Sequence, residues 1–68
     1  MVGLDEHEFS VSLYHEILEA ATLATEHPPA SVLDFNEGDF ERAAQAAHAA
    51  GGLASPATLN QMRAEFGF

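Results

Sequence analysis

The sequence contains no cysteine, no lysine and only two arginines, and each shortage argues against a class of protein. Without cysteine the chain forms no disulfide and offers no thiolate to a metal. So few basic side chains cannot neutralise many phosphates, which disfavours direct binding to nucleic acid or to an anionic membrane surface. No apolar run approaches the roughly 18 residues that cross a bilayer. Because the N-terminus carries acids where a secretory signal carries basic residues, we expect a cytoplasmic protein.

Negative charge is abundant and unevenly distributed. The formal net charge is −9, and residues 1–41 hold ten of the eleven acidic side chains but no arginine. Such a surface attracts a basic protein surface. General solubility, or a halophilic host, is the alternative explanation for the same charge.

The chain has 68 residues, 47% of them apolar. This is too apolar for an ordinary disordered tail, and we expect residues 1–68 to form a single small domain. A chain of this size buries only about 60% of its unfolded surface, so its core is modest. Its stability must come from well-matched helix packing or from a partner, and a homo-oligomer is compatible with this.

The longest helical pattern predicts a helix over about residues 6–27. Asp5 is the predicted N-cap with Glu8 three residues later, Ser10 is a competing cap, and Pro28 forces the end. The stripe predicted to face the core contains Phe9, Leu13, Ile17, Ala20, Ala21 and Ala24, and Leu18 and Leu23 widen this apolar face. The opposite, exposed stripe contains Ser12, His15, Glu16, Glu19, Thr22 and Glu26.

Two further helices are predicted over about 37–50 and 56–66, which gives an all-α, three-helix domain. Asn36 and Asp39 form a capping box, and Phe35 with Phe40 forms a hydrophobic staple. The second helix is rich in alanine and ends at Gly51–Gly52, so it can approach the first helix closely. Ser55 followed by proline starts the third helix, whose apolar stripe is Leu59, Met62 and Phe66.

The connector between the first two helices is too apolar to be a free linker. Val32, Leu33 and Phe35 are therefore expected to pack on the first helix. Within this connector, residues 31–34 are the one candidate for an extended segment.

Catalytic and metal-binding patterns are weak. His15 and Glu19 share a helix face at a spacing that suits a metal, but two ligands do not make a site. No nucleophile elbow, triad or phosphate-binding glycine loop is present. We therefore predict no enzyme activity, no metal and no cofactor.

Two other readings concern the second and third helices. They resemble a helix-turn-helix superficially, with Thr58, Asn60, Gln61 and Arg63 available to bases, but the surrounding acids oppose DNA binding. Gly51–Gly52 also suits a precursor cleaved after Gly52 to release residues 53–68. Ala49 and Ala46 stand where such leaders carry bulky residues, so a helix cap is the better interpretation.

The favoured hypothesis is an acidic protein-binding module. One form of it is an inhibitor that presents carboxylates to a basic, nucleic-acid-binding surface, in analogy of charge to phage-encoded inhibitors. The alternative is an accessory or assembly subunit of a larger complex. The predicted partner-binding residues are Glu8, Glu16, Glu19, Glu26, Asp34, Glu37, Asp39 and Glu41, with Tyr14 and Leu18 as apolar contacts beside Val11.

Overall fold

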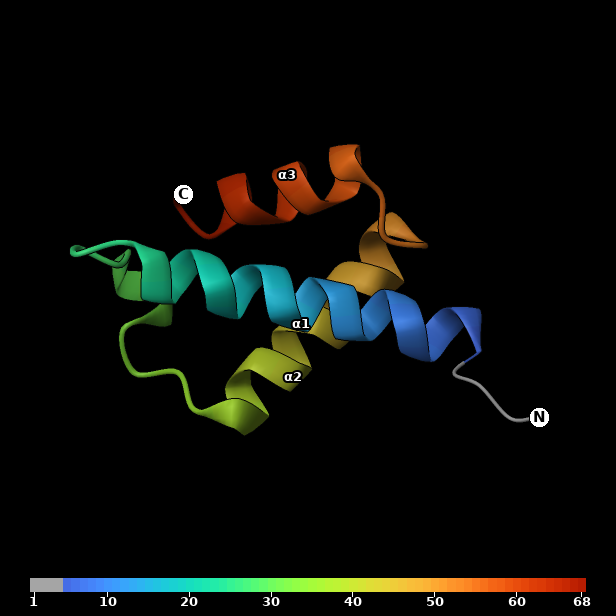
Figure 1. The fold of residues 1–68 in the computed structure, drawn as a ribbon, viewed down its shortest axis with the longest axis horizontal. Helices are drawn as coiled ribbons and strands as arrows, with labels where there is room; N and C mark the ends of the chain where they lie inside the picture. The colour runs from blue at the N-terminus through green and yellow to red at the C-terminus, as the bar shows by residue number, and fades with distance from the viewer. Residues whose placement is uncertain (1–4) are drawn as a thin grey trace.

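The computed structural model describes residues 5–68 and contains three α-helices, with no strand among those residues. The helices are α1 (Glu6–Ala24), α2 (Glu37–Gly51) and α3 (Pro56–Glu65), and a short 3₁₀ turn spans Ala30–Val32. α1 packs against both other helices, with α2 crossing one side of it and α3 running along another (Figure 1). The predicted all-α, three-helix architecture is therefore confirmed. None of these helices combines the length and the apolar character needed to cross a membrane.

Local capping chemistry sets the start of each helix. The Asp5 carboxylate accepts from the Glu8 backbone N–H at 2.8 Å and begins α1 at Glu6, as predicted. Asn36 and Asp39 form a reciprocal capping box at α2, as do Ser55 and Thr58 at α3. Each of these caps satisfies backbone donors that would otherwise lack a partner at a helix N-terminus.

The predicted staple is also present, because the rings of Phe35 and Phe40 meet edge to face with centroids 5.2 Å apart. At the other end of α2, Gly52 has a φ of +78° and its N–H donates to the His48 carbonyl at 2.8 Å. This left-handed conformation favours glycine, so the pair Gly51–Gly52 does end the helix as expected.

The end of α1 and the connector differ from the prediction. α1 ends at Ala24, three residues before the predicted end, and Thr25 is extended. Pro28 has no N–H to donate to the Ala24 carbonyl, so the last predicted turn cannot complete its hydrogen bonds. The expected extended segment at residues 31–34 is wrong, because residues 30–32 form a 3₁₀ turn. Val32 is buried and Phe35 packs against the core, but Leu33 is 61% exposed.

The core uses a stripe of α1 that overlaps only partly with the predicted apolar face, at Leu18 and in part at Ile17. Its buried side chains are Val11, Tyr14, Leu18, Val32, Phe40, Ala44 and Met62. Phe9, placed in the core by the sequence pattern, is 57% exposed, and Ile17 is only partly buried against the core. α1 is apolar around much of its circumference, and the polar atoms of Ser10 and Tyr14 find partners on the face that packs. Those hydrogen bonds remove the cost of burying these two side chains.

Candidate functional site

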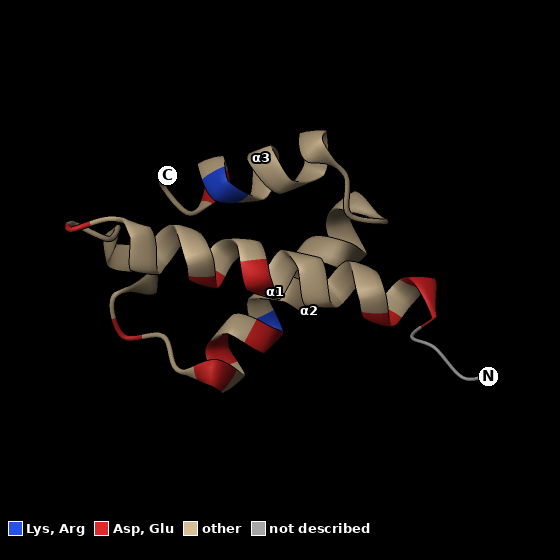
Figure 2. Ribbon diagram, in the orientation of Figure 1, with Lys and Arg blue, Asp and Glu red and all other residues tan. Residues whose placement is uncertain are grey.

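The close packing of α1 on α2 brings a histidine and several acids together. Ala44 of α2 is fully buried, and small side chains of this kind let two helix backbones approach. His15 of α1 therefore reaches the first half of α2. Acidic residues lie along α1, the following connector and the first turns of α2, whereas α3 has few charges (Figure 2).

His15 lies at the centre of this group. Its Nδ1 is 3.0 Å from Oε1 of Glu41, and its Nε2 is 3.3 Å from Oε2 of Glu37. The ring also stacks on Phe40, with centroids 6.0 Å apart. The prediction that His15 lies on an exposed stripe is wrong, because its side chain is only 15% exposed. The cause is the rotation of α1 that turns Tyr14 and Leu18 toward the core.

A fourth side chain, Glu19, completes the group from α1. One ligand atom from each of His15, Glu19 and Glu37 can be chosen so that all three lie within 4.8 Å of one another. We call His15, Glu19, Glu37 and Glu41 the histidine–carboxylate cluster. The sequence analysis recognised the pair His15 and Glu19 and named Glu37 and Glu41 as partner-binding residues. It did not predict that these two acids of α2 approach His15, since this depends on how the helices pack.

The cluster shifts the pKa values of its members in different directions. The hydrogen bond to Glu41 raises the pKa of His15, with attraction from Glu37 and Glu19 adding to it and burial opposing it. The same hydrogen bond lowers the pKa of Glu41, assisted by a hydrogen bond from Gln45. A hydrogen bond with the carboxyl of Glu37 is the main cause that raises the pKa of Glu19, and burial and repulsion between the two carboxylates add to it.

The other predicted acids lie in several places. Glu8 lines a groove of about 430 Å³ between α1 and α2, together with Glu41, Val11 and His7. Asp39 caps α2 and pairs with Arg42, whereas Glu16 is exposed on α1. Glu26 and Asp34 are exposed in the connector. The structure thus gathers Glu19, Glu37 and Glu41, places Glu8 in the groove beside Glu41, and leaves the remaining acids outside the cluster.

Tyr14 and Leu18 do not lie on the surface, so the prediction that they contact a partner is wrong. Their exposed fractions are 1% and 0%, and Val11 beside them is 6% exposed. The hydroxyl of Tyr14 donates to the Gly52 carbonyl at 2.9 Å, which fixes this side chain inside the fold. All three are core residues because α2 and α3 cover this stripe of α1.

The exposed apolar surface lies elsewhere on α1. Phe9 and Leu53 are more than half exposed, and with Leu13 they line a shallow hollow of about 150 Å³. We call these three residues the Phe9 patch. Leu23 and Leu33 are also exposed, but neither lines this hollow.

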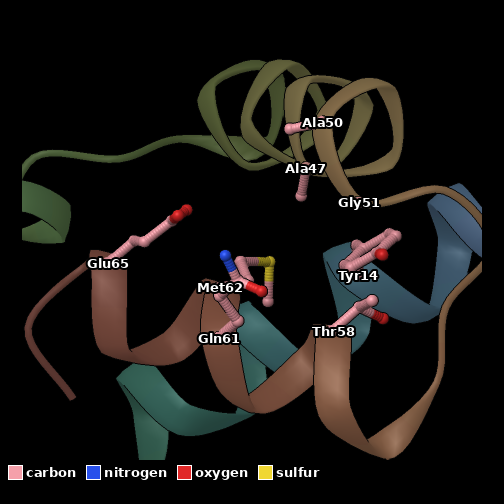
Figure 3. A pocket seen from close by; sticks show the side chains of 8 residues that line it. All are labelled: Tyr14, Ala47, Ala50, Gly51, Thr58, Gln61, Met62 and Glu65. Carbon is pink, nitrogen blue, oxygen red and sulfur yellow. The ribbon is translucent and has the colours of Figure 1, made fainter.

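A second hollow lies between α2 and α3, beside Tyr14 (Figure 3). Ala47, Ala50 and Gly51 line it from α2 and supply little bulk, while Met62 approaches from α3. Its volume of about 70 Å³ is well below the roughly 300–1,000 Å³ of ordinary ligand pockets. The hollow therefore reflects the small side chains of α2 and does not resemble a substrate pocket.

The candidate helix-turn-helix residues are partly engaged in internal contacts. The Thr58 side chain belongs to the capping box of α3, and the side-chain oxygen Oδ1 of Asn60 accepts from the Arg63 guanidinium at 3.4 Å. Gln61 is exposed.

Comparisons of this chain with protein-family models, with curated proteins and with solved structures find no match.

Proposed function

We propose that this chain is an acidic protein-binding module that docks on a basic surface of another protein. The observation that supports this best is the groove between α1 and α2, which is lined by the carboxylates of Glu8 and Glu41. A lysine or arginine side chain suits such a groove, because its apolar stem can lie over Val11 while its charge meets the carboxylates.

The net charge of −9 supports the same proposal on a larger scale. Charge of one sign speeds the approach of an oppositely charged partner and disfavours partners of like charge. In one specific form of the proposal, the partner is a nucleic-acid-binding protein and the carboxylates occupy the positions of phosphates. The chain then acts as an inhibitor by competing with the nucleic acid.

The test uses the immobilised protein to capture partners from a lysate of the organism that encodes it, with identification by mass spectrometry. For a purified partner, affinity should fall steeply with salt, because the Debye length shrinks from about 8 Å at physiological ionic strength to about 3 Å at 1 M. If the partner binds nucleic acid, duplex DNA or RNA should compete with this chain for the partner's basic surface. An affinity that does not change with salt would contradict the electrostatic proposal.

A matched pair of variants tests the groove itself. Glu8→Lys reverses a charge in the groove, whereas Glu65→Lys makes the same change on an exposed side chain of α3. We expect Glu8→Lys to weaken binding and Glu65→Lys to leave it nearly unchanged, with both proteins equally helical by circular dichroism. Equal losses would point to net charge alone.

A second candidate, an accessory or assembly subunit, is favoured by the Phe9 patch. Large apolar side chains gathered on a small protein suggest an interface, and Phe9 and Leu53 are 57% and 52% exposed. For such a subunit, Phe9→Ser should abolish a salt-independent interaction. Leu23→Ser is the control, because Leu23 is 80% exposed and lies outside the patch.

A further inference from the structure

The histidine–carboxylate cluster has the donor types of a transition-metal site. His15 and Glu19 come from neighbouring turns of α1, and Glu37 comes from the first turn of α2. Together they offer one imidazole nitrogen and two carboxylate oxygens within 4.8 Å of one another. Zinc is bound by these atom types, and sites with three protein ligands keep a fourth position for water.

The second ring nitrogen of His15 already has the partner that a metal-binding histidine usually has. Its Nδ1 is hydrogen-bonded to Glu41, and its ring stacks on Phe40, so Nε2 is directed toward Glu37. A carboxylate on the far nitrogen holds the imidazole in one orientation and raises its basicity as a ligand. Glu41 thus stands where a supporting carboxylate is needed.

Within residues 5–68, no arginine balances the negative charge of the cluster. The sequence has no lysine, Arg42 pairs with Asp39, and Arg63 contacts Asn60. Among residues 5–68 no ion pair joins an arginine to the cluster. Three carboxylates around one imidazole leave an excess of negative charge even when the ring is protonated, and a divalent cation would neutralise it.

We propose that the chain binds one Zn²⁺ through Nε2 of His15 and one carboxylate oxygen each of Glu19 and Glu37. The donors must close to about 2.0–2.2 Å from the metal. Glu37 can do so by changing rotamer, because its side chain is 78% exposed. This proposal goes beyond protein binding, and it can be tested on the isolated chain without a partner.

Another pair of histidines is the competing location. The rings of His7 and His48 are 4.3 Å apart, but Nδ1 of His48 is engaged by Ser10. The cluster of acidic residues also attracts any cation weakly, so a built site must be distinguished from diffuse attraction. If Zn²⁺ binds at the two histidines, replacing His7 should abolish binding. If it is only attracted by the negative charge, replacing any acid, Glu16 included, should weaken binding equally.

The test is isothermal titration calorimetry with Zn²⁺ alone, after removal of metal with a chelator, together with thermal unfolding. We expect one Zn²⁺ per chain and a rise in melting temperature, since a ligand that binds the folded state stabilises it. Glu37→Gln removes an exposed ligand and should abolish tight binding. Glu41→Gln should weaken it by roughly 10-fold to 100-fold, as expected for a group that orients a ligand.

The controls are Glu16→Gln and His7→Gln, which keep the proposed ligands and should bind Zn²⁺ as the unaltered protein does. Thermal unfolding in chelator verifies that each variant folds. The proposal is overturned if Zn²⁺ does not bind, if His7→Gln abolishes binding, or if Glu16→Gln weakens binding as much as Glu37→Gln. It is also overturned if Mg²⁺ at equal concentration raises the melting temperature as much as Zn²⁺ does. Mg²⁺ is a hard cation that demands octahedral oxygen ligands, so an equal effect would show that charge alone causes the stabilisation.

Discussion

Oγ of Ser10 lies 2.8 Å from Nδ1 of His48, and this hydrogen bond joins the start of α1 to the end of α2. The same oxygen accepts the backbone N–H of Ala54 at 2.8 Å. Ser10 is 2% exposed and is the buried polar residue of the described chain. One hydroxyl therefore connects α1, α2 and the segment that leads to α3.

Replacing Ser10 with alanine should destabilise the fold. The change removes two hydrogen bonds and leaves the Ala54 N–H without its partner, which costs about 1–3 kcal/mol. Ser12→Ala is the matched control, because Ser12 is exposed on the same helix and alanine has the higher helix propensity. Urea unfolding should give a lower midpoint for Ser10→Ala and an unchanged or higher one for Ser12→Ala. Equal midpoints would contradict a structural role for Ser10.

Leu18 and Leu23 test which stripe of α1 forms the core. Leu18 is fully buried and Leu23 is 80% exposed. Leu18→Ala should lower the free energy of unfolding by about 2–5 kcal/mol, because it removes apolar contacts and leaves a cavity. Leu23→Ala should change it by less than about 0.5 kcal/mol. If chemical denaturation shows a larger loss of stability for Leu23→Ala than for Leu18→Ala, α1 is rotated from the orientation described.

The stability of the metal-free protein should decrease as the pH rises above neutrality. The pKa of His15 is raised above its ordinary value of 6.5, so its protonated form stabilises the folded state. That contribution is complete below about pH 6.5 and is lost as the pH passes through the higher pKa of the folded protein. The groups facing His15 are Glu19 on α1 and Glu37 and Glu41 on α2.

The measurement is thermal unfolding in chelator between about pH 6 and 9, a range above the ordinary carboxyl pKa of about 4.3. In His15→Gln, the part of the pH-dependent fall in melting temperature that comes from His15 should be absent. His27→Gln should keep it, because His27 is exposed in the connector. A decrease that survives in His15→Gln would assign the effect to another group.

Local features of the fold could be predicted because they depend on residues close in sequence. The capping box of Asn36 and Asp39, three residues apart, forms as predicted. Ser55 caps α3 as predicted, and it does so in a box with Thr58 that the sequence analysis did not name. The start of α1 at Glu6 follows from Asp5 in the same way. Each of these contacts is decided within one helical turn.

The orientation of α1 could not be predicted in this way. Phe9, Leu13 and Ile17 form an apolar stripe as regular as the one that packs. The deciding contacts of Ser10 and Tyr14 are made with residues 38 to 44 positions away. Periodicity contains no information about such distant partners, so the predicted apolar face included the buried Leu18 but was centred on the wrong stripe.

The candidate site was predicted in part for a related reason. The acids were identified individually, and His15 with Glu19 was recognised as a pair. The approach of Glu37 and Glu41 to His15 requires the alanines of α2 to pack on α1 at one particular register. Helix register depends on the whole interface, and no single residue of the sequence specifies it.

α3 makes more contacts with α1 than with α2. It packs on α1 and makes little contact with α2, and Met62 is its one buried residue. Leu59 and Phe66 add partly buried contacts, but a helix with one fully buried side chain is expected to open before the pair α1–α2 does. The amide hydrogens of α3 should therefore exchange with solvent through local unfolding, and those of α1 and α2 through more global opening. We therefore expect the chain to behave as a two-helix unit on which the third helix docks reversibly.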